Sequence, residues 1–129
     1  MGERRILVAD DEPFILRSLS YVLRREGFAV VEARDGEEAV AVAAREQPEL
    51  VFLDVMMPKK NGFDVLAELR ALPQTRDCHV VLLTAKGQGS DRERGLALGC
   101  DDYMTKPFSP MKIVERARQV LAPAPSSPS

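Results

Sequence analysis

Four groups of polar residues follow apolar runs in this sequence, and their side chains are suited to phosphoryl chemistry. The groups are Asp10-Asp11, Asp54, Thr84 and Lys106. A carboxylate can attack phosphorus as a nucleophile, whereas a hydroxyl and an ammonium group can bind phosphate oxygens. Taken alone, each of these residues could equally be a helix cap or a surface charge. Their shared position after four apolar runs makes chance a poor explanation.

The segments around these residues predict alternating strands and helices. Unbroken apolar runs at 6–9, 50–53 and 80–83 are typical of strands that are buried on both faces of a parallel sheet. Shorter strands are predicted at 28–31 and 101–104. The expected helices are Pro13 to Gly27, Asp35 to Pro48 with Asp35 and Glu38 as a capping box, Gly62 to Pro73, a weak helix that carries Leu96 and Leu98 to Gly99, and Pro110 to Leu121 after a Ser109 cap.

Five alternations of strand and helix predict an α/β fold, in which helices cover both faces of a parallel five-stranded sheet. Right-handed crossovers leave few topologies, and we predict the flavodoxin-like, doubly wound strand order 2-1-3-4-5 with five helices. Ligand sites in such folds form at the carboxyl ends of the strands, where the strand order reverses. That point lies between the first and third strands, so Asp10 and Asp11 are expected beside Asp54.

Three carboxylates that converge on one point repel one another, and a divalent cation is the usual remedy. A hard, all-oxygen site with room for water suits Mg²⁺. The alternative is that the carboxylates are partly protonated, or that Lys106 alone neutralises them. Mg²⁺ with a phosphoryl group explains more of the pattern, because Thr84 and Lys106 are suited to phosphate oxygens. Asp54 is the candidate nucleophile, which would form an aspartyl-phosphate.

The composition argues against several other classes of protein. The chain has 129 residues and a formal net charge of −2, which predicts one domain without a basic nucleic-acid-binding surface. No apolar run reaches the length of a membrane span and no signal peptide is evident, so we expect a cytoplasmic protein. Residues 1–122 are expected to form the domain. The Pro/Ser-rich residues 123–129 are expected to be a disordered tail or the start of a linker.

Four stretches resemble the receiver domain of two-component response regulators, which has the fold of the chemotaxis regulators. They are Ile-Leu-Val-Ala-Asp-Asp-Glu at 6–12, Leu-Asp-Val-Met-Met-Pro-Lys-Lys-Asn-Gly at 53–62, Leu-Thr-Ala at 83–85 and Gly-Cys-Asp-Asp-Tyr-Met-Thr-Lys-Pro-Phe at 99–108. Any one motif would be weak, but four in this order are highly specific. The resemblance extends from about Arg4 to Leu121 and implies that Asp54 accepts a phosphoryl group from a sensor histidine kinase or a phosphotransfer protein.

The resemblance also implies a role for each residue around the phosphoacceptor. Asp11, Asp54 and the backbone carbonyl of Met56 would bind Mg²⁺ directly, while Asp10 would act mainly through water. Met56 also occupies one of two positions that tune the dephosphorylation rate, and Lys86 occupies the other. Since the Met56 side chain offers no hydrogen bond to an attacking water, we expect a long-lived phosphoryl state.

Switching would depend on residues farther along the chain. The resemblance implies that Thr84 and Lys106 contact the phosphoryl group, and that Tyr103 turns inward when Thr84 moves toward it. The Lys106-Pro107 peptide bond would be cis. The output would be the surface of the fourth helix, fifth strand and fifth helix, which would control an unknown downstream partner or output domain without direct contact to nucleic acid or membrane.

The same surface resembles that of DNA-binding regulators, which dimerise through it, at Arg92, Asp101, Asp102 and Arg116. Lys112 stands where those proteins usually carry an acid that pairs with the residue at position 92. Because two like charges there would weaken the dimer, we expect a monomer or a weak dimer.

Two other functions fit parts of the pattern. One is an interaction module that keeps the fold and works without phosphorylation, but a full set of site residues argues against it. The other is a phosphatase with an aspartate nucleophile, which would need a second acid at the position of Met56. We therefore interpret the chain as a phosphoacceptor switch that catalyses only its own phosphorylation and dephosphorylation, and not as an ordinary enzyme.

Overall fold

One parallel sheet forms the centre of the protein, in the strand order β2-β1-β3-β4-β5. The structure is a computed structural model that describes residues 4–85, 89–107 and 109–121. The strands are β1 (Arg5–Ala9), β2 (Ala29–Ala33), β3 (Leu50–Asp54), β4 (His79–Thr84) and β5 (Asp102–Thr105). Neighbouring strands pair in parallel throughout. The predicted strand order is confirmed.

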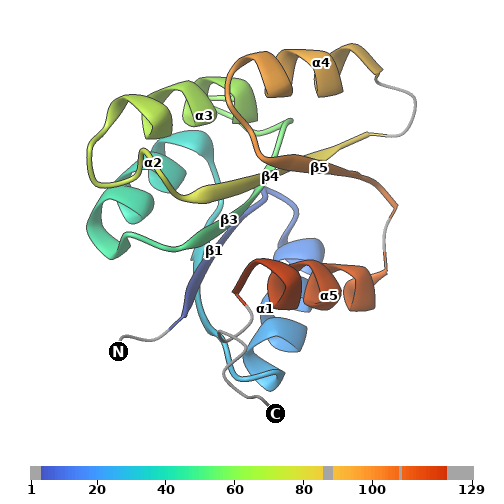
Figure 1. The fold of residues 1–129 in the computed structure, drawn as a ribbon. Helices are drawn as coiled ribbons and strands as arrows, with labels where there is room; N and C mark the ends of the chain where they lie inside the picture. The colour runs from blue at the N-terminus through green and yellow to red at the C-terminus, as the bar shows by residue number, and fades with distance from the viewer. Residues whose placement is uncertain (1–3, 86–88, 108, 122–129) are drawn as a thin grey trace.

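Helices cover both faces of this sheet (Figure 1). They are α1 (Pro13–Arg25), α2 (Gly36–Glu46), α3 (Gly62–Ala71), α4 (Gly89–Ala97) and α5 (Pro110–Leu121). Figure 1 shows α1 and α5 together on one side of the sheet, and α2, α3 and α4 on the other. Among the described residues, no helix combines the length and apolar composition needed to cross a bilayer.

The central strands are apolar throughout because each of their faces packs against helices. Leu7 and Val51 belong to the cluster under α2 and α3. Ile6 and Phe52, their neighbours in the chain, belong to the cluster under α1 and α5. All five residues of β3 are buried. A fully buried Leu or Phe stabilises the fold by about 1.5–3 kcal/mol, so β3 ends in a rigid position.

Side-chain caps begin several helices where the sequence predicts them. The Asp35 carboxylate accepts a hydrogen bond from the Glu38 backbone N–H at 2.8 Å. The Glu38 side chain accepts one from the Arg34 N–H rather than from the N–H of Asp35, so the capping box is shifted by one residue. The Ser109 hydroxyl oxygen accepts a bond from Lys112 N–H at 3.3 Å, as predicted.

Some predicted boundaries are wrong by one or two residues. Phe28 precedes β2 because its N–H donates to the Leu23 carbonyl and closes the end of α1. In the fourth helix, Leu96 is exposed and Leu98 lies beyond the last turn. Gly95 faces the sheet instead, since a Cβ there would lie 2.4 Å from Leu82 Cδ1. The predicted tail at 123–129 and the rate-tuning residue Lys86 lie outside the described residues.

Candidate functional site

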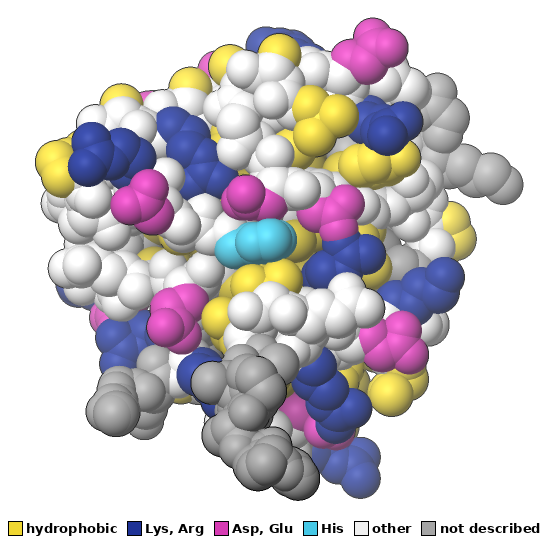
Figure 2. Space-filling model, viewed as in Figure 1, with side chains coloured by type: hydrophobic (Ala, Val, Ile, Leu, Met, Phe, Trp, Pro, Cys, Tyr) yellow, Lys and Arg dark blue, Asp and Glu magenta, His cyan; other side chains and the backbone are white. Residues whose placement is uncertain are grey.

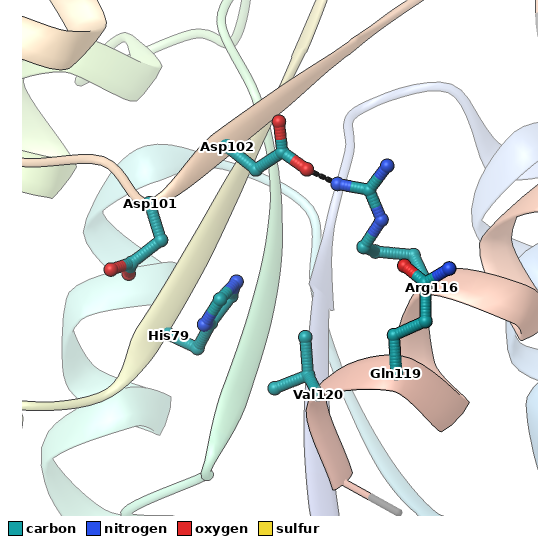
Figure 3. A pocket seen from close by; sticks show the side chains of 6 residues that line it. All are labelled: His79, Asp101, Asp102, Arg116, Gln119 and Val120. Carbon is teal, nitrogen blue, oxygen red and sulfur yellow. Dashed lines mark ion pairs between the residues drawn. The ribbon is translucent and has the colours of Figure 1, made fainter.

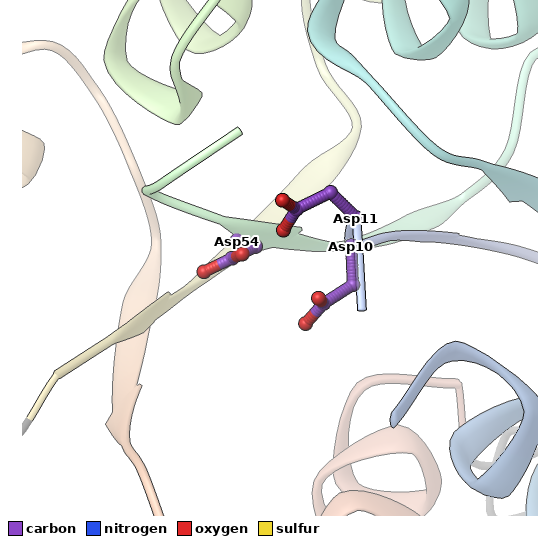
Figure 4. Close-up of side chains that lie close together, drawn as sticks. All are labelled: Asp10, Asp11 and Asp54. Atoms are coloured by element: carbon purple, nitrogen blue, oxygen red, sulfur yellow. The ribbon is translucent and has the colours of Figure 1, made fainter. Parts of the chain in front are cut away.

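Three carboxylates lie together at the carboxyl ends of β1 and β3 (Figure 4). Asp10 and Asp11 follow β1, Asp54 ends β3, and the two strands are neighbours in the sheet. One carboxylate oxygen from each residue lies within 4.8 Å of the others. Asp10 is fully buried and Asp54 is 4% exposed, whereas Asp11 is exposed. The predicted strand order therefore brings these three acids together as expected.

Lys106 bridges the two buried carboxylates. Its ammonium nitrogen lies 3.2 Å from Asp10 Oδ2 and 3.2 Å from Asp54 Oδ1. Burial raises the pKa of the Asp54 carboxyl to about 6; the charge of Asp10 adds to this rise and Lys106 opposes it. Burial by itself lowers the pKa of Lys106, but the charges of Asp54 and Asp10 outweigh it and raise that pKa above its usual value. One cation thus faces two buried anions, and the cluster keeps excess negative charge.

The backbone after Asp54 is held tightly under its carboxylate. Met56 N–H lies 3.4 Å from Asp54 Oδ1, and Gly62 N–H donates to the Val55 carbonyl at 2.8 Å. A Cβ on Gly62 would lie 2.6 Å from the Asp54 carbonyl oxygen, so α3 can begin there only with glycine. Sequence reasoning recognised Gly62 as a helix start but missed this contact. The Met56 side chain is 71% exposed and points no hydrogen-bonding group at the site.

The remaining predicted residues lie at the ends of β4 and β5. Thr84 is buried, and its carbonyl accepts a hydrogen bond from Lys106 N–H at 2.7 Å. The Lys106-Pro107 peptide bond is cis, as the resemblance implied. Tyr103 pairs with Leu82, which precedes Thr84 by two residues in β4. The side chains of Tyr103 and Thr84 therefore project from the same face of the sheet. The Tyr103 ring is partly buried, with the Arg92 guanidinium 5.0 Å from its centre.

A second polar hollow lies at the opposite edge of the sheet (Figure 3). It has a volume of about 440 Å³ and is lined by His79, Asp101, Asp102, Arg116, Gln119 and Val120. Asp102 pairs with Arg116, while Asp101 accepts hydrogen bonds from Arg70 and Val80 N–H. Figure 2 shows the single histidine of the chain on this face, among side chains of both charges. These acids are engaged, and they are separated from the carboxylate cluster by the length of the strands.

The carboxylate cluster fits a hard divalent cation. Its donors are oxygens, one acid is exposed to solvent, and Lys106 leaves the negative charge only partly balanced. Mg²⁺ prefers oxygen ligands and usually keeps several of its waters. The residues present are therefore suited to Mg²⁺, as the sequence predicted.

A comparison with models of protein families shows the family to which this chain belongs. A model described as the response regulator receiver domain matches residues 6–118. The chain is a response regulator receiver domain. Receiver domains belong to two-component signalling systems and act as signalling proteins.

Relatives of this receiver domain include two transcriptional regulators. It is 47% identical over 118 residues to the alkaline phosphatase synthesis transcriptional regulatory protein PhoP of Bacillus subtilis, which covers 92% of this chain and 48% of that protein. It is 45% identical over 118 residues to the phosphate regulon transcriptional regulatory protein PhoB of Escherichia coli, with 92% and 52% covered. The receiver domain thus spans about half the length of these relatives.

Solved structures agree with the observed fold. Chemotaxis protein CheY4 of Vibrio cholerae matches with a TM-score of 0.87 at 28% identity, covering 93% of this chain and all of that one. The receiver domain of a Pseudomonas aeruginosa sensor histidine kinase matches with a TM-score of 0.83 at 28% identity, covering 92% and 98%. That structure contains a magnesium ion coordinated in the active site cleft. The predicted family and fold class are confirmed.

Proposed function

We propose that Asp54 accepts a phosphoryl group from the phosphohistidine of a sensor histidine kinase or phosphotransfer protein, in a Mg²⁺-dependent reaction. An Asp54 carboxylate oxygen attacks phosphorus, a P–O bond forms, and the P–N bond to the leaving imidazole breaks. The observation that carries the proposal is the buried Asp54 carboxylate at the end of β3, 3.2 Å from Lys106 and within 4.8 Å of the other two acids. This arrangement presents one nucleophile to a site that holds compensating charge.

The chain's own residues prepare the nucleophile and receive the product. With a pKa of about 6, most of Asp54 is ionised at neutral pH and can attack phosphorus. Lys106, which pairs with Asp54, is proposed to bind one phosphoryl oxygen of the product. The Thr84 hydroxyl is proposed to donate a hydrogen bond to another. Asp11, Asp54 and the Met56 carbonyl would hold Mg²⁺, with Asp10 acting through water. When bound, the ion supplies positive charge that balances the carboxylates and the transferring group.

The proposed response is a change on the surface formed by α4, β5 and α5. Thr84 would move toward the phosphoryl group and Tyr103 would turn inward behind it. The relatives are transcriptional regulators, which supports control of transcription through a downstream partner or output domain. We also propose that residues 1–122 form the receiver domain, that residues 123–129 form a tail or linker, and that the protein is cytoplasmic. Because Arg92 and Lys112 carry like charges on the surface through which related regulators dimerise, we propose a monomer or weak dimer. We propose no direct contact between this chain and nucleic acid.

The test is intact mass after incubation with acetyl phosphate, with Mg²⁺ or with EDTA. We expect one phosphoryl adduct on the wild type, dependent on Mg²⁺ and absent from Asp54→Asn. Asp77→Asn is the matched control, because Asp77 is an exposed acid outside the site and its variant should react like the wild type. A folded wild type that binds Mg²⁺ but forms no adduct would favour a phosphorylation-independent interaction module instead.

A further inference from the structure

The loop between β3 and α3, residues 55–61, contacts the first residue of α2. Gly36 N–H donates to the Pro58 carbonyl at 3.2 Å. A Cβ built on Gly36 would lie 2.0 Å from the Lys60 carbonyl oxygen and 2.6 Å from its carbonyl carbon. These are backbone atoms, which cannot rotate away as the end of a side chain can. The loop can therefore pack against position 36 only when that residue is glycine.

A charged contact joins the same two segments. Lys59 Nζ lies 3.6 Å from Asp35 Oδ2, while Asp35 Oδ1 caps α2 through Glu38 N–H. Lys59 has a φ of 72°, a left-handed conformation that few non-glycine residues adopt. One carboxylate oxygen of Asp35 thus caps α2, and the other forms an ion pair with Lys59 in the loop.

The other end of this loop reaches the phosphoacceptor. Met56 N–H approaches Asp54 Oδ1, and Gly62 closes against the Asp54 backbone. Contacts with Asp54, Gly62 and Gly36 consequently fix the backbone of the loop, which includes Met56. The helix α2 contributes no residue to the carboxylate cluster, and its first residue, Gly36, contacts the loop that carries Met56.

We propose that the Asp35-Gly36 turn is a positioning element for the phosphoacceptor site. It fixes the backbone of the β3–α3 loop, and with it the Met56 carbonyl, which would be a ligand of Mg²⁺. Mg²⁺ demands near-ideal octahedral geometry at short distances, so a small displacement of one ligand weakens its binding. The cation and its Met56 ligand rest on the proposed function; the contact between the turn and the loop does not.

The first test compares the same substitution at the first residues of two helices. Gly36→Ala introduces a Cβ against the Lys60 backbone, whereas Gly89→Ala at the start of α4 meets nothing within 4 Å. Mg²⁺ affinity is measured by isothermal titration on variants whose circular dichroism matches the wild type. We expect Gly36→Ala to bind Mg²⁺ at least tenfold more weakly and Gly89→Ala to stay within twofold. A folded Gly36→Ala with wild-type affinity would overturn the proposal.

A second pair of variants separates positioning from electrostatics and remains decisive if Gly36→Ala does not fold. Asp35→Asn keeps a good N-cap but loses the charge that attracts Lys59. Lys59→Met removes a positive charge, so the electric field alone would tighten Mg²⁺ binding. If the contact positions the loop, both variants bind Mg²⁺ more weakly, by about two- to fivefold, and the double variant is no weaker than either one. Tighter Mg²⁺ binding by Lys59→Met would overturn the proposal.

Phosphorylation provides a separate readout of the same variants. With acetyl phosphate, we expect the rate of Gly36→Ala to fall at low Mg²⁺ and to recover toward the wild-type rate as Mg²⁺ approaches saturation. Because Mg²⁺ also stabilises a folded protein that binds it, the rates are compared at a temperature at which Gly36→Ala is fully folded without the ion. If the wild type forms no adduct, the proposed function fails, whereas the titrations above still decide whether the turn positions a cation site.

Discussion

The guanidinium group of Arg92 covers the ring of Tyr103, with 5.0 Å between its central carbon and the ring centre. Arg92 lies on α4 and Tyr103 on β5, so the contact attaches this helix to the sheet. Arg94 makes a similar contact, 4.3 Å from the centre of the Phe63 ring on α3. Within the described part of the chain, α4 buries only Gly95. Arginine–aromatic contacts therefore add to the packing of Gly95 in attaching α4 to its neighbours.

Removing the Arg92 contact should favour the inward position of Tyr103. A cation–π contact at an exposed site is worth about 0.5–1 kcal/mol, which corresponds to a roughly two- to fivefold change in population. If inward Tyr103 accompanies phosphorylation, Arg92→Ala should react with acetyl phosphate faster by that factor. Glu93→Ala, an exposed change on the same helix, should leave the rate unchanged. An Arg92→Ala rate at or below the wild-type rate would show that the contact does not restrain the switch.

The buried Asp54 carboxylate should make stability depend on pH in the absence of metal. Its pKa is raised from 3.8 to about 6, so the folded state gains stability below pH 4 and loses it as pH rises through 6. As pH rises, the titration of Asp54 lowers the free energy of unfolding of the wild type by about 3 kcal/mol in total, and by about 1.5 kcal/mol between pH 5 and pH 8. Urea unfolding in EDTA should therefore show Asp54→Asn gaining on the wild type over this range. A constant difference between the two proteins would contradict the raised pKa.

Ser20 should be a site where the protein can be stabilised. Its hydroxyl is buried on α1, and it has no hydrogen-bond partner among the described residues. A buried, unpaired hydroxyl costs about 1–3 kcal/mol, and alanine also has the higher helix propensity. Ser20→Ala should raise the free energy of unfolding more than Ser18→Ala, which changes the same residue type at a partly exposed position. Equal gains would mean that helix propensity alone is responsible.

Met56 should keep the phosphoryl group on Asp54 for longer than a polar residue would. Its side chain is exposed and offers no strong hydrogen bond to an attacking water. Met56→Asn supplies such a group, and one hydrogen bond of about 0.5–1.5 kcal/mol corresponds to a roughly two- to tenfold faster loss of phosphate. Mass spectrometry after removal of the donor measures the lifetime. Met111→Asn changes an exposed methionine on α5 and should leave the lifetime unchanged; a shared acceleration would point to an indirect effect.

The local pattern of residues was sufficient to predict much of the fold and the meeting of the acids. An unbroken apolar run such as 50–53 can be buried only if both faces of its strand are covered, which requires a layered parallel sheet. In such a sheet the carboxyl ends of the strands share one edge, and the predicted strand order makes the first and third strands neighbours, so Asp10, Asp11 and Asp54 converge. Periodicity failed at α4, where Gly95 rather than Leu96 faces the sheet.

Only the tertiary structure decided how the site is supported. Three contacts join different elements of the fold: Gly36 approaches Lys60, Lys106 lies between Asp10 and Asp54, and Arg92 covers the Tyr103 ring. Sequence patterns report the preferences of neighbouring residues and the burial of a face. Contacts within a few ångströms depend instead on how strands, helices and loops pack against one another, because a shift of one ångström makes or removes them.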